Sequence, residues 1–172
     1  MSDHTLRAAT GADAPAMLAL LRSVTTEGDT LPFYDDVGTD FIDSQWLGAT
    51  GCVLACAGDS LLGMYRYGPN MPGRGAHVAT ATFLVARHAR GRGLGRLLLL
   101  HSLDTARAAG FRAMQFNQVV ATNHAALALY RSVGFRRVGR IPQAFAHPRD
   151  GYVDAYVMYL DLSCRGERYL LI

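Results

Sequence analysis

Lysine is absent from this chain of 172 residues, and all 17 of its basic residues are arginine. The absence excludes mechanisms that need a lysine side chain: a Walker A phosphate loop, a Schiff-base nucleophile and a lysine general base. An arginine-only composition is typical of a GC-rich genome, which accounts for the bias itself. The missing lysines therefore limit the chemistry without indicating a function.

Cysteines and long apolar runs are also scarce. Cys52 and Cys56 lie four residues apart without a matching His or Cys pair, so no metal site is expected, and the third cysteine leaves an odd number. No segment reaches 18 consecutive apolar residues, and residues 1–4 lack the basic and apolar regions of a signal peptide. We therefore expect a reduced, cytoplasmic protein without a membrane span.

Size and composition predict one packed domain. Half of the residues are hydrophobic and 18% are charged, which excludes global disorder. We expect a single domain over residues 1–162 and a tail over 163–172. Residues 1–61 carry nine acidic residues and two arginines, whereas residues 62–172 carry fifteen arginines and five acidic residues. Such asymmetry fits either a site with an anion-binding and a cation-binding side or two solvated faces.

Hydrophobic periodicity and turn residues predict an α/β domain with a mixed sheet. Loops are expected at residues 27–40, 87–96 and 142–151. The expected elements are a strand at 4–8, helices at 12–26 and 41–47, strands at 52–57, 61–67 and 77–86, a helix at 94–109, a strand at 114–120, a helix at 125–133, and strands at 135–141 and 153–160.

The loop at residues 87–96, RHARGRGLGR, is the most informative segment. Its three glycines leave no Cβ in the way, so backbone N–H groups can converge on an anion. The helix that follows adds N-terminal donors and the positive end of its dipole. Arg87, Arg90, Arg92 and Arg96 supply positive charge, so the segment predicts a polyphosphate site.

Two common polyphosphate motifs do not fit this loop. A Rossmann fingerprint needs a third glycine three residues after the second, but Arg96 and Leu98 occupy the two positions where it would fall. A Walker A loop needs the missing lysine.

The pattern Arg90-x-x-Gly93-x-Gly95, after a long strand and at the start of a helix, resembles the acetyl-CoA signature of the GCN5-related N-acetyltransferase (GNAT) superfamily. Residues 121–135, ATNHAALALYRSVGF, resemble the family's Asn…Ala…Tyr…Gly-Phe stretch. The resemblance covers residues 4–161 in element order. It implies a mixed, mostly antiparallel sheet of six to seven strands, about four flanking helices, and two strands that splay apart at the acetyl-CoA site.

The resemblance also implies how acetyl-CoA would bind. The backbone of Phe83, Leu84 and Val85 would pair with the pantetheine arm as an extra strand would. Asn123 would hydrogen-bond to that arm, and Tyr130 would protonate the leaving thiolate. The other cofactor-binding residues would be Arg90, Gly91, Arg92, Gly93, Leu94, Gly95, Arg96 and Ala126.

A thioester already reacts with a neutral amine, so few catalytic groups are needed: the enzyme aligns the reactants, deprotonates the ammonium and protonates the thiolate. A tyrosine hydroxyl can donate the last proton. The proton acceptor would be Glu27, Asp154 or a chain of waters. Glu27 ends the first helix region, where this family builds its acceptor pocket, so it is also a candidate for substrate binding.

A finer similarity concerns residues 116–123, 134–142 and 151–155. They resemble a GNAT subgroup that includes fungal enzymes acetylating proline analogues such as azetidine-2-carboxylate, and many bacterial proteins share the pattern. In such a subgroup Asn117 would hydrogen-bond to the acceptor. The alternative is an asparagine satisfied by the backbone.

We therefore predict an acetyl-CoA-dependent N-acetyltransferase that acts on a small amine, such as an amino or imino acid, by direct attack in a ternary complex. The alternatives are an acyl-CoA-binding module without turnover, which an intact Asn123 and Tyr130 argue against, and acetylation of a protein or peptide amine. No nucleic-acid partner is expected, because no helix-turn-helix or aromatic RNA-binding motif accompanies the arginines. Whether the chain forms a homodimer is left open.

Overall fold

The computed structural model describes residues 4–33 and 36–163, so Cys164 and all but the first residue of the predicted tail 163–172 lie outside the described residues. The elements run in the order β1 Thr5–Ala8, η1 Gly11–Asp13, α1 Ala14–Glu27, α2 Thr39–Phe41, η2 Ile42–Leu47, β2 Gly51–Ala57, β3 Ser60–Pro69, η3 Gly73–Gly75, β4 Val78–Val85, η4 Arg87–Ala89, α3 Leu94–Ala108, β5 Ala113–Val120, α4 His124–Val133, β6 Arg136–His147 and β7 Gly151–Asp161.

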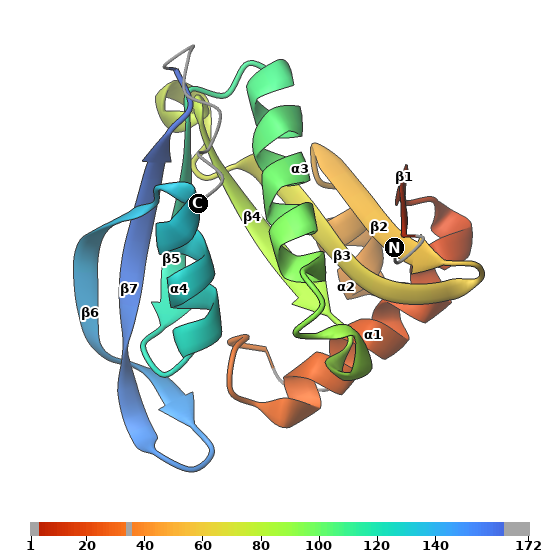
Figure 1. The fold of residues 1–172 in the computed structure, drawn as a ribbon, viewed down its shortest axis with the longest axis horizontal. Helices are drawn as coiled ribbons and strands as arrows, with labels where there is room; N and C mark the ends of the chain where they lie inside the picture. The colour runs from red at the N-terminus through yellow and green to blue at the C-terminus, as the bar shows by residue number, and fades with distance from the viewer. Residues whose placement is uncertain (1–3, 34–35, 164–172) are drawn as a thin grey trace. The chain divides into compact units, whose positions relative to one another are not determined.

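Seven strands form one sheet in the order β1-β2-β3-β4-β5-β7-β6 (Figure 1). The β1/β2, β2/β3, β5/β7 and β6/β7 pairs are antiparallel. The β4/β5 pair is parallel, and its recorded register joins only Val78 to Ala113 and Ala79 to Met114. Together with the four α-helices of the described chain, this confirms the predicted mixed, mostly antiparallel α/β fold.

The chain divides into two compact units. The first comprises residues 1–68 and 81–104, and the second comprises residues 69–80 and 105–172. Strand β4 contributes its first three residues to the second unit and the remaining five to the first. The glycine-rich loop belongs to the first unit, whereas α4 and the β6–β7 pair belong to the second.

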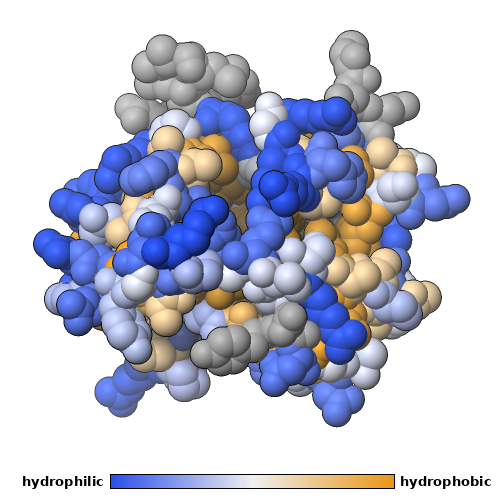
Figure 2. Space-filling view, turned by 90° about the horizontal axis from the view of Figure 1, so that it is seen from below, coloured by the Kyte–Doolittle hydropathy of each residue, from blue (hydrophilic) through white to orange (hydrophobic). Residues whose placement is uncertain are grey.

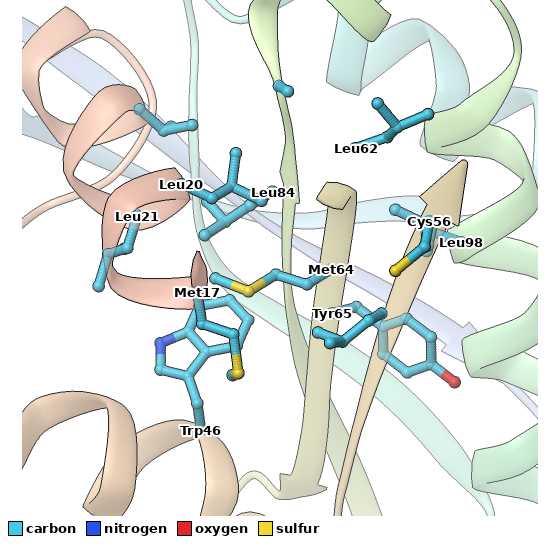
Figure 3. Close-up of a cluster of buried hydrophobic side chains, with 14 of the residues drawn as sticks. Met17, Leu20, Leu21, Trp46, Cys56, Leu62, Met64, Tyr65, Leu84 and Leu98 are labelled. Atoms are coloured by element: carbon cyan, nitrogen blue, oxygen red, sulfur yellow. The ribbon is translucent and has the colours of Figure 1, made fainter. Parts of the chain in front are cut away.

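The core of the first unit forms where α1 and η2 pack on β2, β3 and β4. Met17, Leu21 and Val24 of α1 recur at helical spacing, and all three are buried. Figure 3 shows Met17 and Leu21 in the same interior as Trp46 and Met64, which are also buried. Helix α1 ends at Gly28, whose φ of 71° is the left-handed conformation that terminates many helices. The predicted helix at 12–26 is therefore confirmed.

An aromatic cluster forms part of the core of the second unit. The ring of Phe116 in β5 stacks on that of Phe135 with centroids 4.6 Å apart, and the Tyr130 ring of α4 lies 4.6 Å from Phe116. Helix α4 begins after Asn123, whose Oδ1 accepts a hydrogen bond from the Ala126 N–H, and ends at a left-handed Gly134. The predicted helix at 125–133 is thus confirmed.

The prediction of a loop over residues 142–151 is wrong, because β6 continues through Pro142 to His147. Strand β6 is the last strand in the sheet order, so the missing N–H of Pro142 can face away from β7. Gln143 has a φ of 50°, and the β6/β7 register shifts between Ile141 and Phe145. An edge strand with a bulge accommodates a proline.

The surface drawn in Figure 2 is mostly hydrophilic, with apolar residues visible between the polar ones. The large apolar side chains with the greatest exposure are Met71, Leu97, Val138, Ile141 and Tyr152. None of the helices in the described chain is both long and apolar enough to cross a membrane.

Candidate functional site

The glycine-rich loop of the first unit has the backbone conformation that an anion-binding loop requires. Gly91 and Gly93 have φ values of 75° and 80°, which L side chains rarely adopt. A Cβ at either position would meet nothing within 4 Å, so glycine is needed for its conformation and the space beside the backbone is open. The loop is anchored on both sides, because Ala89 and Leu94 are buried while residues 90–93 are exposed.

Helix α3 begins directly after this loop. The Leu97 N–H donates to the Gly93 carbonyl at 3.0 Å, which closes the first turn. The earlier N–H groups of a helix have no partner within it, and with the helix dipole they favour an anion at this end. Arg87 and Arg92 are exposed, and no described residue forms an ion pair with them. The loop therefore presents backbone donors and positive charge to solvent.

Arg90 is held by contacts within the same unit. Its Nη1 and Nη2 donate to the two carboxylate oxygens of Glu27 at 2.6 and 3.1 Å, and its Nε donates to the Val85 carbonyl at 3.1 Å. Such a bidentate pair fixes the planes of both groups. Arg90 thus ties the loop to the end of α1 and the end of β4, and both oxygens of Glu27 are engaged.

The end of β4, where the pantetheine arm is expected, is supported by β3. Leu84 is buried, and Phe83 and Val85 are partly buried. Gly63 of β3 lies beneath this segment, because a Cβ there would stand 2.9 Å from the Leu84 carbonyl oxygen. Only glycine lets the two strands approach this closely without displacement of the backbone.

Tyr130, the predicted proton donor, lies in the second unit among aromatic rings. Its centroid is 4.6 Å from that of Phe116 and 5.7 Å from that of Phe135. Burial raises the pKa of the Tyr130 hydroxyl well above its ordinary value, so the group stays protonated at physiological pH. No residue of the described ranges forms a hydrogen bond with this hydroxyl.

Asn123 caps the start of α4 with the oxygen of its carboxamide. Its Oδ1 accepts from the Ala126 N–H at 3.1 Å, which leaves the two donors of Nδ2 for another partner. Ala126 thus contributes to the conformation of the helix start.

Asp154 of β7 is bound through both carboxylate oxygens. The Gln143 backbone N–H donates to Oδ1 at 3.0 Å, and Arg140 Nη2 lies 2.5 Å from Oδ2. The hydrogen bond from Gln143, followed by the charge of Arg140, lowers the pKa of Asp154. These contacts hold the β6 bulge, and a lowered pKa makes the carboxylate a weaker proton acceptor.

Asn117 of β5 belongs to a chain of carboxamides. Its Nδ2 donates to Asn70 Oδ1 at 2.6 Å, and its Oδ1 accepts from Gln115 Nε2 at 2.8 Å. The β5/β7 register shifts between Phe116 and Val119, so Asn117 lies in a bulge. The sequence did not indicate Asn70, because nothing in its proline- and glycine-rich segment predicts a partner 47 residues away.

The first unit brings Glu27 together with Arg90 and Val85, and the second unit brings Tyr130 into an aromatic cluster. Asp154 and Asn117 each lie beside a strand bulge with their own partners. The described residues contain no group of His, Cys, Asp and Glu side chains that could hold a metal ion. The sequence did not indicate Arg66 as a functional residue. Arg66 belongs to no recognisable motif, and its neighbours come from other elements of the chain.

Comparison with known proteins identifies the family. Residues 15–135 match the acetyltransferase (GNAT) family, so the chain belongs to this family. The chain is 40% identical over 99 residues to the N-acetyltransferase aca1 of Schizosaccharomyces pombe, a match that covers 57% of the chain but only 47% of that relative.

Two further relatives are matched over most of their length. The chain is 29% identical over 147 residues to an L-methionine sulfoximine/L-methionine sulfone acetyltransferase of Pseudomonas paraeruginosa, a match that covers 81% of the chain and 84% of that protein. The solved structure of a GCN5-related N-acetyltransferase from Kribbella flavida is 41% identical and superposes with a TM-score of 0.86, covering 92% of the chain and 97% of that structure.

Proposed function

We propose that this chain is an acetyl-CoA-dependent N-acetyltransferase that acetylates the amine of a small molecule such as an amino or imino acid. The observation that carries the proposal is the exposed glycine–arginine loop at the start of α3, whose Gly91 and Gly93 adopt left-handed conformations with open space beside them. Membership of the GNAT family supports the same activity.

Acetyl-CoA would be bound mainly by backbone groups. The N–H groups of residues 91–96 would bind the pyrophosphate, with Arg90, Arg92 and Arg96 nearby. The backbone of residues 83–85 would pair with pantetheine, and the free Nδ2 donors of Asn123 would bind the same arm. In this assignment Arg90 acts indirectly, because its guanidinium is occupied by Glu27 and Val85 and therefore holds the loop in shape.

The reaction follows from these assignments. The neutral amine nitrogen attacks the thioester carbonyl carbon and forms the new C–N bond. The tetrahedral intermediate then breaks the C–S bond, and the thiolate takes the hydroxyl proton of Tyr130. The nitrogen loses one proton to give the neutral amide, and this proton restores the Tyr130 hydroxyl. The raised pKa keeps this hydroxyl protonated at physiological pH, so the proton is present when the thiolate forms. The ammonium proton of the incoming amine passes to Glu27, to Asp154 or to a chain of waters.

The acceptor class is supported by the Pseudomonas relative, which is named for acetylation of L-methionine sulfoximine and L-methionine sulfone. Proline analogues are a second amino-acid class to test, because of the similarity of residues 116–123, 134–142 and 151–155 to enzymes that acetylate them. Asn117 would take part in acceptor binding, and its bonds to Asn70 and Gln115 would fix the direction of its carboxamide.

The test is a screen that measures release of the CoA thiol from acetyl-CoA. The panel contains L-methionine sulfone, L-methionine sulfoximine, azetidine-2-carboxylate, proline, a polyamine, an aminoglycoside and a peptide with a free N-terminus. We expect saturable release with at least one amino acid. Release with the peptide alone would move the acceptor to protein amines. Failure of the folded protein to bind acetyl-CoA in calorimetry would refute the proposal.

A further inference from the structure

Arg66 of β3 occupies an unusual environment in the first unit. Its guanidinium carbon lies 5.8 Å from the centroid of the Trp46 ring, and its Nη1 donates to the Gln45 backbone carbonyl at 2.8 Å. The side chain is partly buried, and its partner across the sheet is Cys52 of β2. Two contacts from η2 therefore hold the guanidinium plane in place.

The positive charge of Arg66 has no counter-charge within the described residues. Arg7, Arg90 and Arg140 each form an ion pair with a carboxylate, but no described acidic side chain pairs with Arg66. Burial raises the pKa of the Cys52 thiol to about 12, so this neighbour is neutral. Burial also lowers the pKa of Arg66, as expected for a cation without a nearby anion.

One edge of this guanidinium is unused. The Nε atom is buried, and neither Nε nor Nη2 forms a hydrogen bond with any residue of the described chain. The N–H of Nε and one N–H of Nη2 point in the same direction and form a fork that matches the two oxygens of a carboxylate. A buried donor without a partner costs free energy that an arriving anion can offset.

We propose that the Nε–Nη2 edge of Arg66 binds the carboxylate of an amino-acid acceptor. The inference rests on the proposed function, since it assigns the substrate class of the same reaction. A carboxylate is favoured over a phosphate of CoA, because the CoA phosphates would have their own donors in the glycine–arginine loop. Selection for a free carboxylate follows, since a neutral amide would leave the cation unpaired.

Binding is tested first without turnover, by the fluorescence of Trp46, which is the single tryptophan of the chain. The probes are L-methionine sulfone and proline, each compared with its carboxamide. We expect a saturable change with each acid and none with either amide. Arg66→Met should abolish the change, and Arg66→Lys should weaken binding about tenfold or more, because lysine keeps the charge but lacks the fork.

A matched control is Arg22→Met. Arg22 also donates to a backbone carbonyl, that of Val37, through Nε at 3.1 Å and Nη2 at 2.8 Å, so its loss removes a comparable contact in the same unit. We expect the fluorescence response of this variant to match that of the wild type. Equal loss of the response in both variants, with equal loss of melting temperature, would assign Arg66 a structural role and overturn the proposal.

Turnover supplies the second readout. Arg66→Met should lower kcat/KM for an acceptor with a free carboxylate by about 10- to 100-fold. The kcat/KM for the carboxamide of the same acceptor and the affinity for acetyl-CoA should remain nearly unchanged. If the wild type and Arg66→Met each acetylated the amino acid and its carboxamide equally well, the Arg66 assignment would be overturned and the acetyltransferase function would stand. A carboxylate-dependent fluorescence change without transfer to any amine would support the Arg66 assignment and refute the function. A change caused by CoA alone and lost in Arg66→Met would assign the fork to a phosphate and overturn the proposal.

Discussion

At the scale of single residues, each of the two carboxylates that could accept the ammonium proton forms an ion pair with an arginine. Glu27 engages Arg90 through both oxygens, and Asp154 is bound by Arg140 and by the backbone of Gln143. The lowered pKa of Asp154 keeps this carboxylate ionised and makes it a weaker proton acceptor. Each of these side chains can thus serve structure and chemistry, and substitutions can separate the two.

Removal of the Tyr130 hydroxyl should lower the turnover rate by about 100-fold or more, in the range typical of a lost general acid. Tyr130→Phe keeps the ring contacts with Phe116 and Phe135, so the affinity for acetyl-CoA should change by no more than about twofold. Steady-state kinetics and calorimetry check the two effects. The control is Tyr152→Phe, which removes an exposed hydroxyl from the same unit. An unchanged turnover rate in Tyr130→Phe would remove this residue as the acid.

Substitution of Glu27 distinguishes its two roles. Glu27→Gln removes the charge that holds Arg90, so the glycine–arginine loop should loosen and KM for acetyl-CoA should rise by about tenfold. We expect the turnover rate to fall less than this. Kinetics at several pH values provide the check, because the loss of a base would also remove the acidic limb of the pH–rate profile. If turnover instead slowed by about 100-fold with KM unchanged, the result would contradict our expectation and assign Glu27 as the base.

At the scale of elements, the strand–loop–helix segment from β4 to α3 combines rigidity with open backbone. Buried Leu84 and Leu94 hold its two sides, and the carbonyl of Val85 is bonded to Arg90. The exposed part depends on two left-handed glycines. An anion site of this kind needs no specific side chain, so its conformation is the property to perturb.

Gly93→Ala should weaken acetyl-CoA binding by about tenfold, because a left-handed alanine costs about 1 kcal/mol and the loop would relax to another conformation. The matched control is Gly73→Ala. Gly73 has a φ of 61° and equally open surroundings, so it should lose similar stability without loss of affinity. Calorimetric titration and thermal melts measure the two effects. Equal loss of affinity in both variants would show that the effect is not local to the loop.

At the scale of the whole molecule, part of the acidity of residues 1–61 is neutralised by arginines. Asp13 accepts from Arg7 Nη1 and Nη2 at 2.9 and 2.6 Å and from the Thr10 N–H at 2.8 Å. The hydrogen bond from Arg7, the largest cause, holds the pKa of Asp13 well below its usual range. Asp13 thus contributes to stability through an arginine of the same part of the chain.

The stability of the protein should therefore depend on pH through Asp13. Since its pKa is lower in the folded state, the contribution is complete above the ordinary value of about 4 and is lost as pH falls below it. Asp13→Asn should lower the melting temperature by about 2–4 °C at pH 7. The difference from wild type should narrow below about pH 4. Asp36→Asn, at an exposed position, serves as the control. A difference that stays constant on acidification to about pH 3 would contradict the assignment.

Local patterns were enough to predict most elements and the family. Apolar residues at helical spacing, a capping asparagine and helix-ending glycines act within a few residues, so they can be read before the chain folds. The extension of β6 through Pro142 was missed, because a proline ends a central strand but not an edge strand, and the position of a strand in the sheet is not a local property.

Contacts between distant segments had to come from the folded chain. Glu27 and Arg90 are 63 residues apart, Asn70 and Asn117 are 47 apart, and Arg66 lies against residues of η2 that share no motif with it. Sequence spacing says which chemistry a chain carries. Whether a charge is paired, buried or left open depends on which segments the hydrophobic core packs together. For this reason the glycine–arginine loop was predicted from its residues, whereas the unpaired edge of Arg66 became visible only in three dimensions.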